Sequence, residues 1–173
     1  LCNMNLEDFR NTPFRMQDLS SVFPNCANLK MKAKRLEYDG DIIRLKKGLY
    51  VASPLTSRLK LSPFLLANHI YGPSYVSMQT ALRYYGLIPE AVYSVQSMTT
   101  GVARDYENTI GTFNYIHAPA RYYSIGVTMR ESAGATFMIA TPEKALCDLM
   151  VFTPNLNLRF QTSMRDYLED DIR

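Results

Sequence analysis

The chain has 173 residues, of which 47% are hydrophobic. This length allows one large domain or two small ones, and the composition excludes a globally disordered chain. Apolar runs extend over only a few residues, so the sequence predicts no transmembrane span.

The positive charge is concentrated near the N-terminus. The whole chain has a formal net charge of +3. Residues 1–52 contain nine Lys or Arg and six Asp or Glu, whereas residues 53–173 contain ten of each. Localised positive charge is typical of a protein that binds a polyanion. A solvated helix face is the alternative explanation for the same charges.

The first elements predicted along the chain are two short helices, at residues 5–11 and 16–23. Pro13 separates them, because a proline disfavours helical backbone in the residue before it. In the second helix Leu19 and Phe23 recur on one face, as expected for the support helix of a DNA-binding unit.

Residues 25–40 predict a basic amphipathic helix. We expect Asn25 to cap its N-terminus and Gly40 to end it with a positive φ angle. The apolar stripe of this helix is expected to contain Cys26, Leu29, Ala33 and Leu36. The opposite side is expected to show Asn28, Met31, Lys34, Arg35 and Tyr38, flanked by Lys30 and Lys32.

Residues 41–51 predict a β-hairpin with cations near its tip. Ile43 and Leu45 alternate with charged residues, and Gly48 supplies the turn. A helix that buries one stripe and exposes cations, followed by such a hairpin, is typical of a winged helix-turn-helix. The helix of that unit enters the major groove of DNA, and the hairpin, or wing, lies over phosphates.

Residues 62–173 predict a second set of helices and strands. Ser62 and Pro63 are typical of a helix start, because serine caps the helix and proline needs no N–H partner at its first position. A second helix is expected to be capped by Ser77 and to end at Gly86. The remaining elements expected are strands at residues 93–99, 111–117, 122–130 and 135–140, and helices at 142–152 and 163–172.

The fold class predicted from these elements is α+β. A winged helix-turn-helix at residues 4–52 is followed by a linker at residues 53–61. A small α+β domain with an antiparallel sheet follows at residues 62–173.

No constellation of residues favours catalysis, so we expect no enzyme activity and no cofactor. His69 and His117 have no partner at the spacing of a metal site, and no phosphate-binding glycine loop is present. Glu143, Lys144 and Asp148 resemble an acid–base set on one helix. A helix-dipole contact of Glu143 and an i,i+4 pair of the other two explain them equally well.

Three cysteines, Cys2, Cys26 and Cys147, are widely spaced and odd in number. This spacing predicts neither a disulfide framework nor a zinc site, and it favours a reducing cytoplasm. We expect Cys26 to lie on the inner stripe of its helix and Cys147 to be a small buried residue.

Several segments together resemble one protein family. Residues 73–77 are Pro-Ser-Tyr-Val-Ser, residues 85–90 are Tyr-Gly-Leu-Ile-Pro-Glu, and residues 139–149 include Pro-Glu-Lys-Ala-Leu-Cys-Asp. With residues 44–51, which resemble the family's wing, they are similar to AbiEi-type antitoxins, the transcriptional regulators of type IV toxin–antitoxin systems. The resemblance covers residues 10–152.

This resemblance implies a repressor that binds double-stranded operator DNA and acts as an antitoxin. Its functional partner would be a nucleotidyltransferase-like toxin, generally without a stable complex, and the second domain would oligomerise or carry the antitoxin function. Arg35 suits a guanine edge, and the lysines add salt-dependent affinity. The residues expected at the DNA are Gln17, Asn28, Lys30, Lys32, Lys34, Arg35, Arg44, Lys46 and Lys47.

A hypothesis of another class is a protein-interaction module, in which the winged helix is a scaffold that docks a protein partner. Salt separates the two hypotheses, because phosphate contacts weaken steeply with salt through counterion release and an apolar interface does not.

Overall fold

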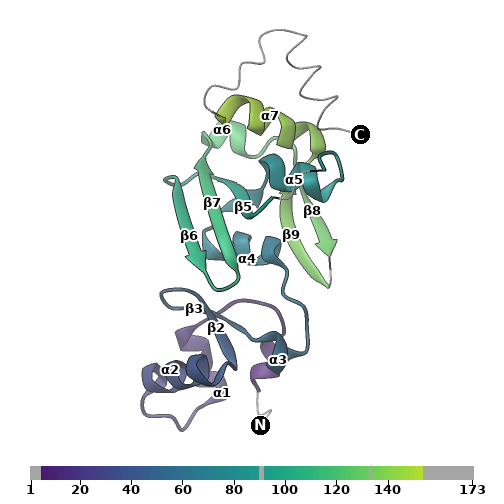
Figure 1. The fold of residues 1–173 in the computed structure, drawn as a ribbon. Coiled ribbons are helices and arrows are strands. Elements are labelled where there is room, and N and C mark those ends of the chain that lie inside the picture. The colour runs from purple at the N-terminus through teal and green to yellow at the C-terminus, as the bar shows by residue number, and fades with distance from the viewer. Residues whose placement is uncertain (1–4, 90–91, 133, 154–173) are drawn as a thin grey trace.

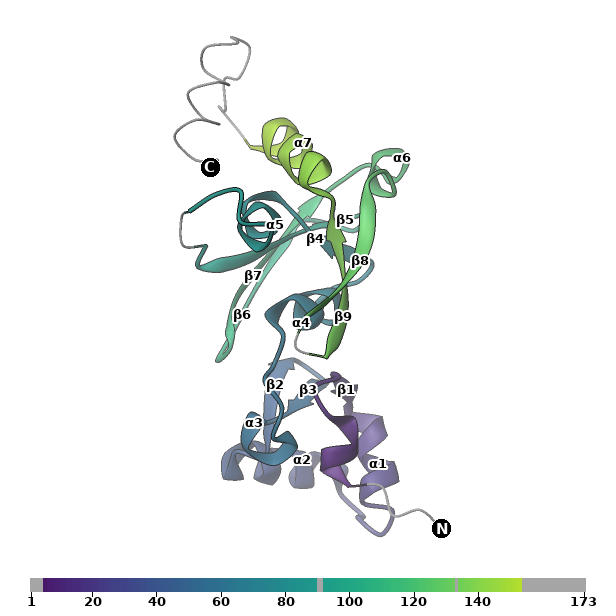
Figure 2. The same ribbon diagram turned by 90° about the vertical axis from the view of Figure 1, so that its right-hand side faces the viewer.

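The computed structural model describes residues 5–89, 92–132 and 134–153. These residues form a mixed α+β fold with a three-stranded and a six-stranded sheet. A smaller N-terminal part and a larger part follow one another along the long direction of the molecule (Figures 1 and 2). Helix α2 lies at one end and helix α7 at the other. None of the helices in the described ranges is long and apolar enough to cross a membrane.

The N-terminal part packs short helices against a small antiparallel sheet, with strand order β1-β3-β2. Its buried residues include Phe14, Leu19 and Leu36, which come from β1, α1 and α2. Its elements are η1 (Leu6–Phe9), β1 (Phe14–Arg15), η2 (Met16–Asp18), α1 (Leu19–Val22), α2 (Leu29–Asp39), β2 (Ile42–Lys46) and β3 (Leu49–Ala52).

The larger part is built on the six-stranded sheet, with strand order β6-β7-β5-β4-β9-β8. Helix α4 packs against β4, β5 and β9, and α5 packs against β5 and α7. The short helix α3 (Pro54–Ser57) lies with the N-terminal part (Figure 1). The elements of the larger part are α4 (Pro63–Ile70), β4 (Ser74–Val76), α5 (Met78–Tyr84), β5 (Ser94–Thr99), β6 (Arg104–Asn108), β7 (Gly111–His117), α6 (Ala120–Tyr123), β8 (Val127–Ser132), β9 (Ala135–Ala140) and α7 (Pro142–Phe152).

The prediction of a purely antiparallel sheet was wrong. Strand β4 runs parallel to β9, and β5 runs parallel to β7, while the other neighbours are antiparallel. The strand expected at residues 122–130 is instead helix α6 followed by β8. The expected linker at 53–61 contains α3, which packs against η1. The helix expected at 163–172 lies outside the described residues.

A buried ion pair within α7 is part of a polar network that connects this helix to strand β4. The Lys144 Nζ lies 3.1 Å from Asp148 Oδ1, and both side chains are almost inaccessible to solvent. The other carboxylate oxygen of Asp148 accepts hydrogen bonds from Ser77 Oγ at 2.6 Å and from Tyr75 Oη at 3.1 Å. Burial and the nearby carboxylate raise the pKa of Tyr75, so its phenol keeps its proton and donates.

This network confirms the predicted i,i+4 pair and corrects two neighbouring expectations. Ser77 precedes α5, but its hydroxyl binds Asp148 and makes no capping bond. Cys147 is exposed, because it points away from the sheet while its neighbours on α7 point inward.

Replacing Asp148 by Asn leaves the buried Lys144 ammonium without its counter-charge. We expect the free energy of unfolding to fall by about 3–5 kcal/mol, as for other buried pairs that lose one partner. Glu143→Gln, on the exposed side of the same helix, is the matched control and should leave stability nearly unchanged. Urea unfolding followed by circular dichroism measures both variants. Equal stability of the two would contradict a stabilising role for the network.

Candidate nucleic-acid interface

Helix α2 begins at Leu29, and its N-cap lies three residues later than the predicted one. Asn28 is its N-cap, since Asn28 Oδ1 accepts a hydrogen bond of 3.1 Å from the backbone N–H of Met31. The expected cap, Asn25, lies in a turn that is closed by a hydrogen bond from Cys26 N–H to the Phe23 carbonyl. Cys26 is therefore half-buried beside the helix and not within it.

The end of α2 and its inner face agree with the predictions. Gly40 has a φ of +80°, the left-handed conformation that glycine adopts without steric cost. Ala33 and Leu36 are buried in the N-terminal core, and Leu29 packs against it. Lys32 lies near this inner side, with its ammonium 4.6 Å from the centroid of the Phe23 ring. A cation–π contact of this kind holds Lys32 close to the protein.

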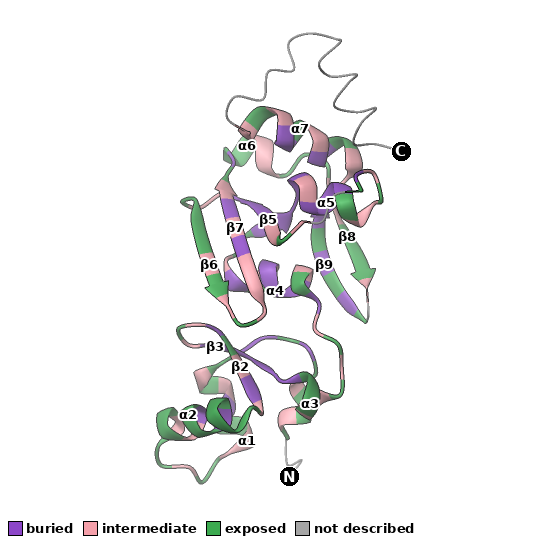
Figure 3. Ribbon diagram, viewed as in Figure 1, coloured by how far each residue is buried: buried purple, intermediate pink, exposed green. Residues whose placement is uncertain are grey.

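The outer face of α2 combines cations with exposed apolar groups. Residues at i, i+3, i+4 and i+7 share one side of a helix. On α2 these are Met31, Lys34, Arg35 and Tyr38, and all four are exposed (Figure 3). Lys30 is exposed at the edge of this row. The guanidinium of Arg35 lies 3.6 Å from the carboxylate of Asp39. An exposed ion pair of this kind contributes little free energy, so Arg35 can leave Asp39 for another anion at little cost.

The hairpin of β2 and β3 contributes buried side chains to two cores. Ile42 and Tyr50 belong to the N-terminal core, whereas Leu45, Leu49 and Val51 belong to the core of the larger part. A bulge between Arg44 and Lys46 adds one residue to β2, which alters the alternation of side chains near the tip. The hairpin therefore joins the two parts instead of projecting freely.

Polar contacts hold the hairpin tip in place. The Lys46 ammonium donates a hydrogen bond to the carbonyl of Ile70, the last residue of α4. The negative end of the α4 dipole favours a cation there. Asn108 Nδ2, from β6, donates to the Leu45 carbonyl at 3.2 Å. Burial, and secondarily the nearby Arg15, lower the pKa of Lys46.

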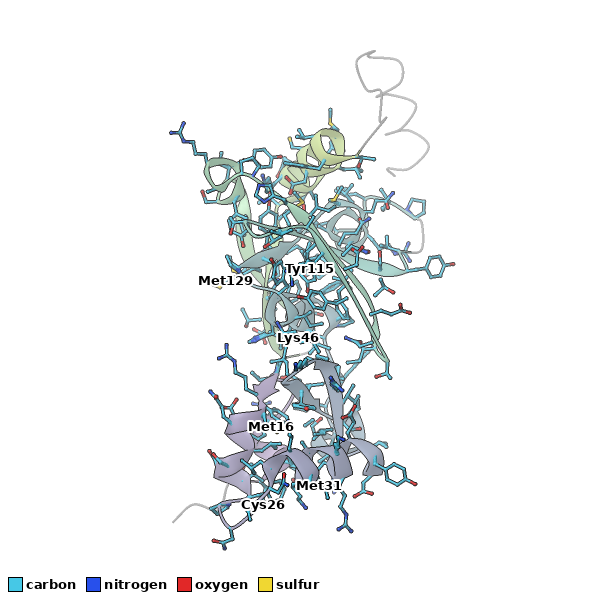
Figure 4. The ribbon with its side chains drawn as sticks, turned by 90° about the vertical axis from the view of Figure 1, so that its left-hand side faces the viewer. Met16, Cys26, Met31, Lys46, Tyr115 and Met129 are labelled. Carbon is cyan, nitrogen blue, oxygen red and sulfur yellow. The ribbon has the colours of Figure 1, made fainter. Side chains whose placement is uncertain are left out.

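The structure thus separates the predicted DNA-contacting residues into groups. Lys46 lies at the junction of the two parts, whereas Met31 lies toward one end of the molecule (Figure 4). Lys46 is therefore not available for the phosphate contact that was expected of it. Arg44 and Lys47 are exposed on the hairpin, and Gln17 is exposed on η2. The cations brought together on the outer side of α2 are Lys30, Lys34 and Arg35.

The described ranges offer little support for metal or acid–base chemistry. They contain no group of three or more His, Cys, Asp or Glu side chains that could hold a metal ion. Lys144 and Asp148, two members of the acid–base set considered from the sequence, have side chains that are only 4% and 0% exposed, so they are not accessible to a substrate in this structure.

No protein-family model matches the chain, and no curated protein matches it significantly.

The contact of Lys46 with α4 can be tested by removing its charge. Lys46→Met keeps the aliphatic stem and deletes the ammonium donor. We expect the free energy of unfolding to fall by about 1–2 kcal/mol, because a charge-assisted hydrogen bond at a helix end is lost. Lys47→Met, at the exposed neighbouring position, is the control and should change stability little. A thermal or urea melt that cannot distinguish the two variants would contradict the docked tip.

Proposed function

We propose that this chain is a cytoplasmic DNA-binding repressor that regulates its own operon and acts as an antitoxin of the AbiEi kind. The observation that carries the DNA-binding part is the outer face of α2. There Lys34, Arg35 and Lys30 are exposed together on a helix whose other side is fixed in the core. Clustered cations of this kind neutralise DNA phosphates, and arginine also binds guanine edges.

The order of elements supports a winged helix-turn-helix. Helix α1 packs against α2, and the β2–β3 hairpin follows α2 directly. In such a unit the second helix enters the major groove. Because the hairpin tip contacts the larger part, Arg44 and Lys47 would supply the phosphate contacts of this wing without Lys46.

The antitoxin role has a different support, namely the similarity of the segments at residues 73–90 and 139–149 to the AbiEi family. In this proposal the larger part counters a nucleotidyltransferase-like toxin, generally without a stable complex, or it mediates assembly. One winged helix contacts a short half-site, so tight operator binding would use two protomers.

A protein-interaction module is the second candidate function. Met31 and Tyr38 are exposed to 67% and 90% on the same outer face, and exposed apolar groups of this size are common in protein interfaces. Under this alternative, binding would depend on these two side chains and would be nearly insensitive to salt.

A gel-shift titration distinguishes the two functions. We would use the DNA upstream of this protein's own gene, in the presence of excess non-specific DNA, with the variant Lys34→Ala/Arg35→Ala. We expect at least about a 10-fold loss of affinity, because one bidentate contact alone contributes that much. The slope of log K against log salt should become shallower by about one for each phosphate contact removed.

The matched control is Arg121→Ala/Arg130→Ala, which removes two exposed cations from α6 and β8 in the larger part. This variant has the same net charge as the first, so it should retain competitor-resistant binding. Binding that the competitor erases, or that both variants weaken equally, would refute recognition of an operator by α2.

A further inference from the structure

Met31 is an apolar side chain surrounded by cations on the outer face of α2. It is 67% exposed. With Asn28, Lys30 and Lys34 it lines a shallow hollow of about 120 Å³ at the beginning of the helix. Figure 4 shows Met31 at the end of the molecule that lies farthest from the large sheet. No other element of the described chain lines this hollow.

The charges around Met31 favour a polyanion at this half of the helix. Among the described residues that line the hollow there is no acidic side chain. The acids of α2, Glu37 and Asp39, lie in its last turn, and Asp39 is paired with Arg35. In helix-turn-helix proteins the N-terminal residues of the recognition helix contact the base edges. The cationic half of α2 is thus the half that would lie deepest in the groove.

A duplex bound to Lys30 and Lys34 would cover Met31 and remove it from water. Burial of an apolar side chain is favourable when the surface that covers it is also apolar. On the base edges of the major groove the C5-methyl group of thymine is the most prominent apolar group, and most of the other groups there are hydrogen-bond donors and acceptors.

We propose that Met31 packs against the C5-methyl group of a thymine and makes recognition dependent on that base. This inference rests on the proposed DNA-binding function and adds a base preference to it. The adjacent amide of Asn28 has its carbonyl occupied by the helix cap, so its Nδ2 is the group left to donate toward a neighbouring base.

The test removes each partner of the contact in turn, first the thymine methyl group and then the Met31 side chain. The full chain first selects a duplex from a random-sequence library, and each thymine of that duplex is then replaced by deoxyuridine. This replacement preserves the hydrogen-bonding groups and deletes only the methyl. For the unsubstituted protein we expect one or two positions at which uracil weakens DNA binding roughly three- to tenfold. This is the loss expected when one buried methyl group is removed.

The same duplexes are then bound by Met31→Ala. If the two groups touch, the uracil effect at those positions should disappear in this variant, as in a double-mutant cycle. Met129→Ala is the matched control, because Met129 is exposed to a similar extent, 64%, but lies on β8 in the larger part. This control should keep the full sensitivity to uracil.

Two results would overturn the inference in different ways. Specific binding that no uracil substitution weakens, or that stays equally sensitive in Met31→Ala, refutes the thymine contact and leaves operator recognition intact. Failure of the library to yield any competitor-resistant duplex refutes the proposed function itself, and the thymine contact with it.

Discussion

The docking of the β2–β3 hairpin against the larger part is the constraint on which the rest of the molecule depends. One short hairpin contributes Ile42 and Tyr50 to one core and Leu45, Leu49 and Val51 to the other. The hydrogen bonds from Lys46 to Ile70 and from Asn108 to Leu45 fix the orientation of the hairpin within this apolar contact. Because the hairpin directly follows α2, the contact also leaves α2 at the end of the molecule away from the large sheet (Figure 1).

This constraint divides cations that look equivalent in the sequence. Lys46 and Lys47 are neighbours near a predicted turn, yet one ammonium binds the carbonyl end of α4 and the other is exposed. Lys144 is likewise inside the protein, where its ammonium faces Asp148, the Tyr122 carbonyl and the Tyr122 ring. Charge that is engaged in this way contributes to stability, whereas Lys30, Lys34 and Arg35 remain exposed together on α2.

Elements with local chemical signals could be predicted from the sequence. Ser62-Pro63 and Thr141-Pro142 begin helices α4 and α7, and Gly40 ends α2, because caps and positive φ angles depend on single residues. Long-range effects were missed. Strand β6 carries Arg104, Asp105 and Glu107, so it lacks the apolar alternation of a strand and depends on pairing with β7. Asn25 and Asn28 are both suitable caps, and packing of the preceding turn selects the second. On α2, the prediction that Met31 and Tyr38 lie on the outer side is correct, but only the structure shows how far they are exposed.

The most direct test of this account is a titration of the ¹⁵N-labelled protein with an operator duplex, followed by backbone amide chemical shifts. At 19.8 kDa the chain is suitable for this measurement. The account predicts that the largest changes map to α2 between Asn28 and Tyr38, with smaller changes around Arg44 and Lys47 of the hairpin and little change in the six-stranded sheet. Large changes at the tip or in the six-stranded sheet, with α2 unaffected, would contradict it.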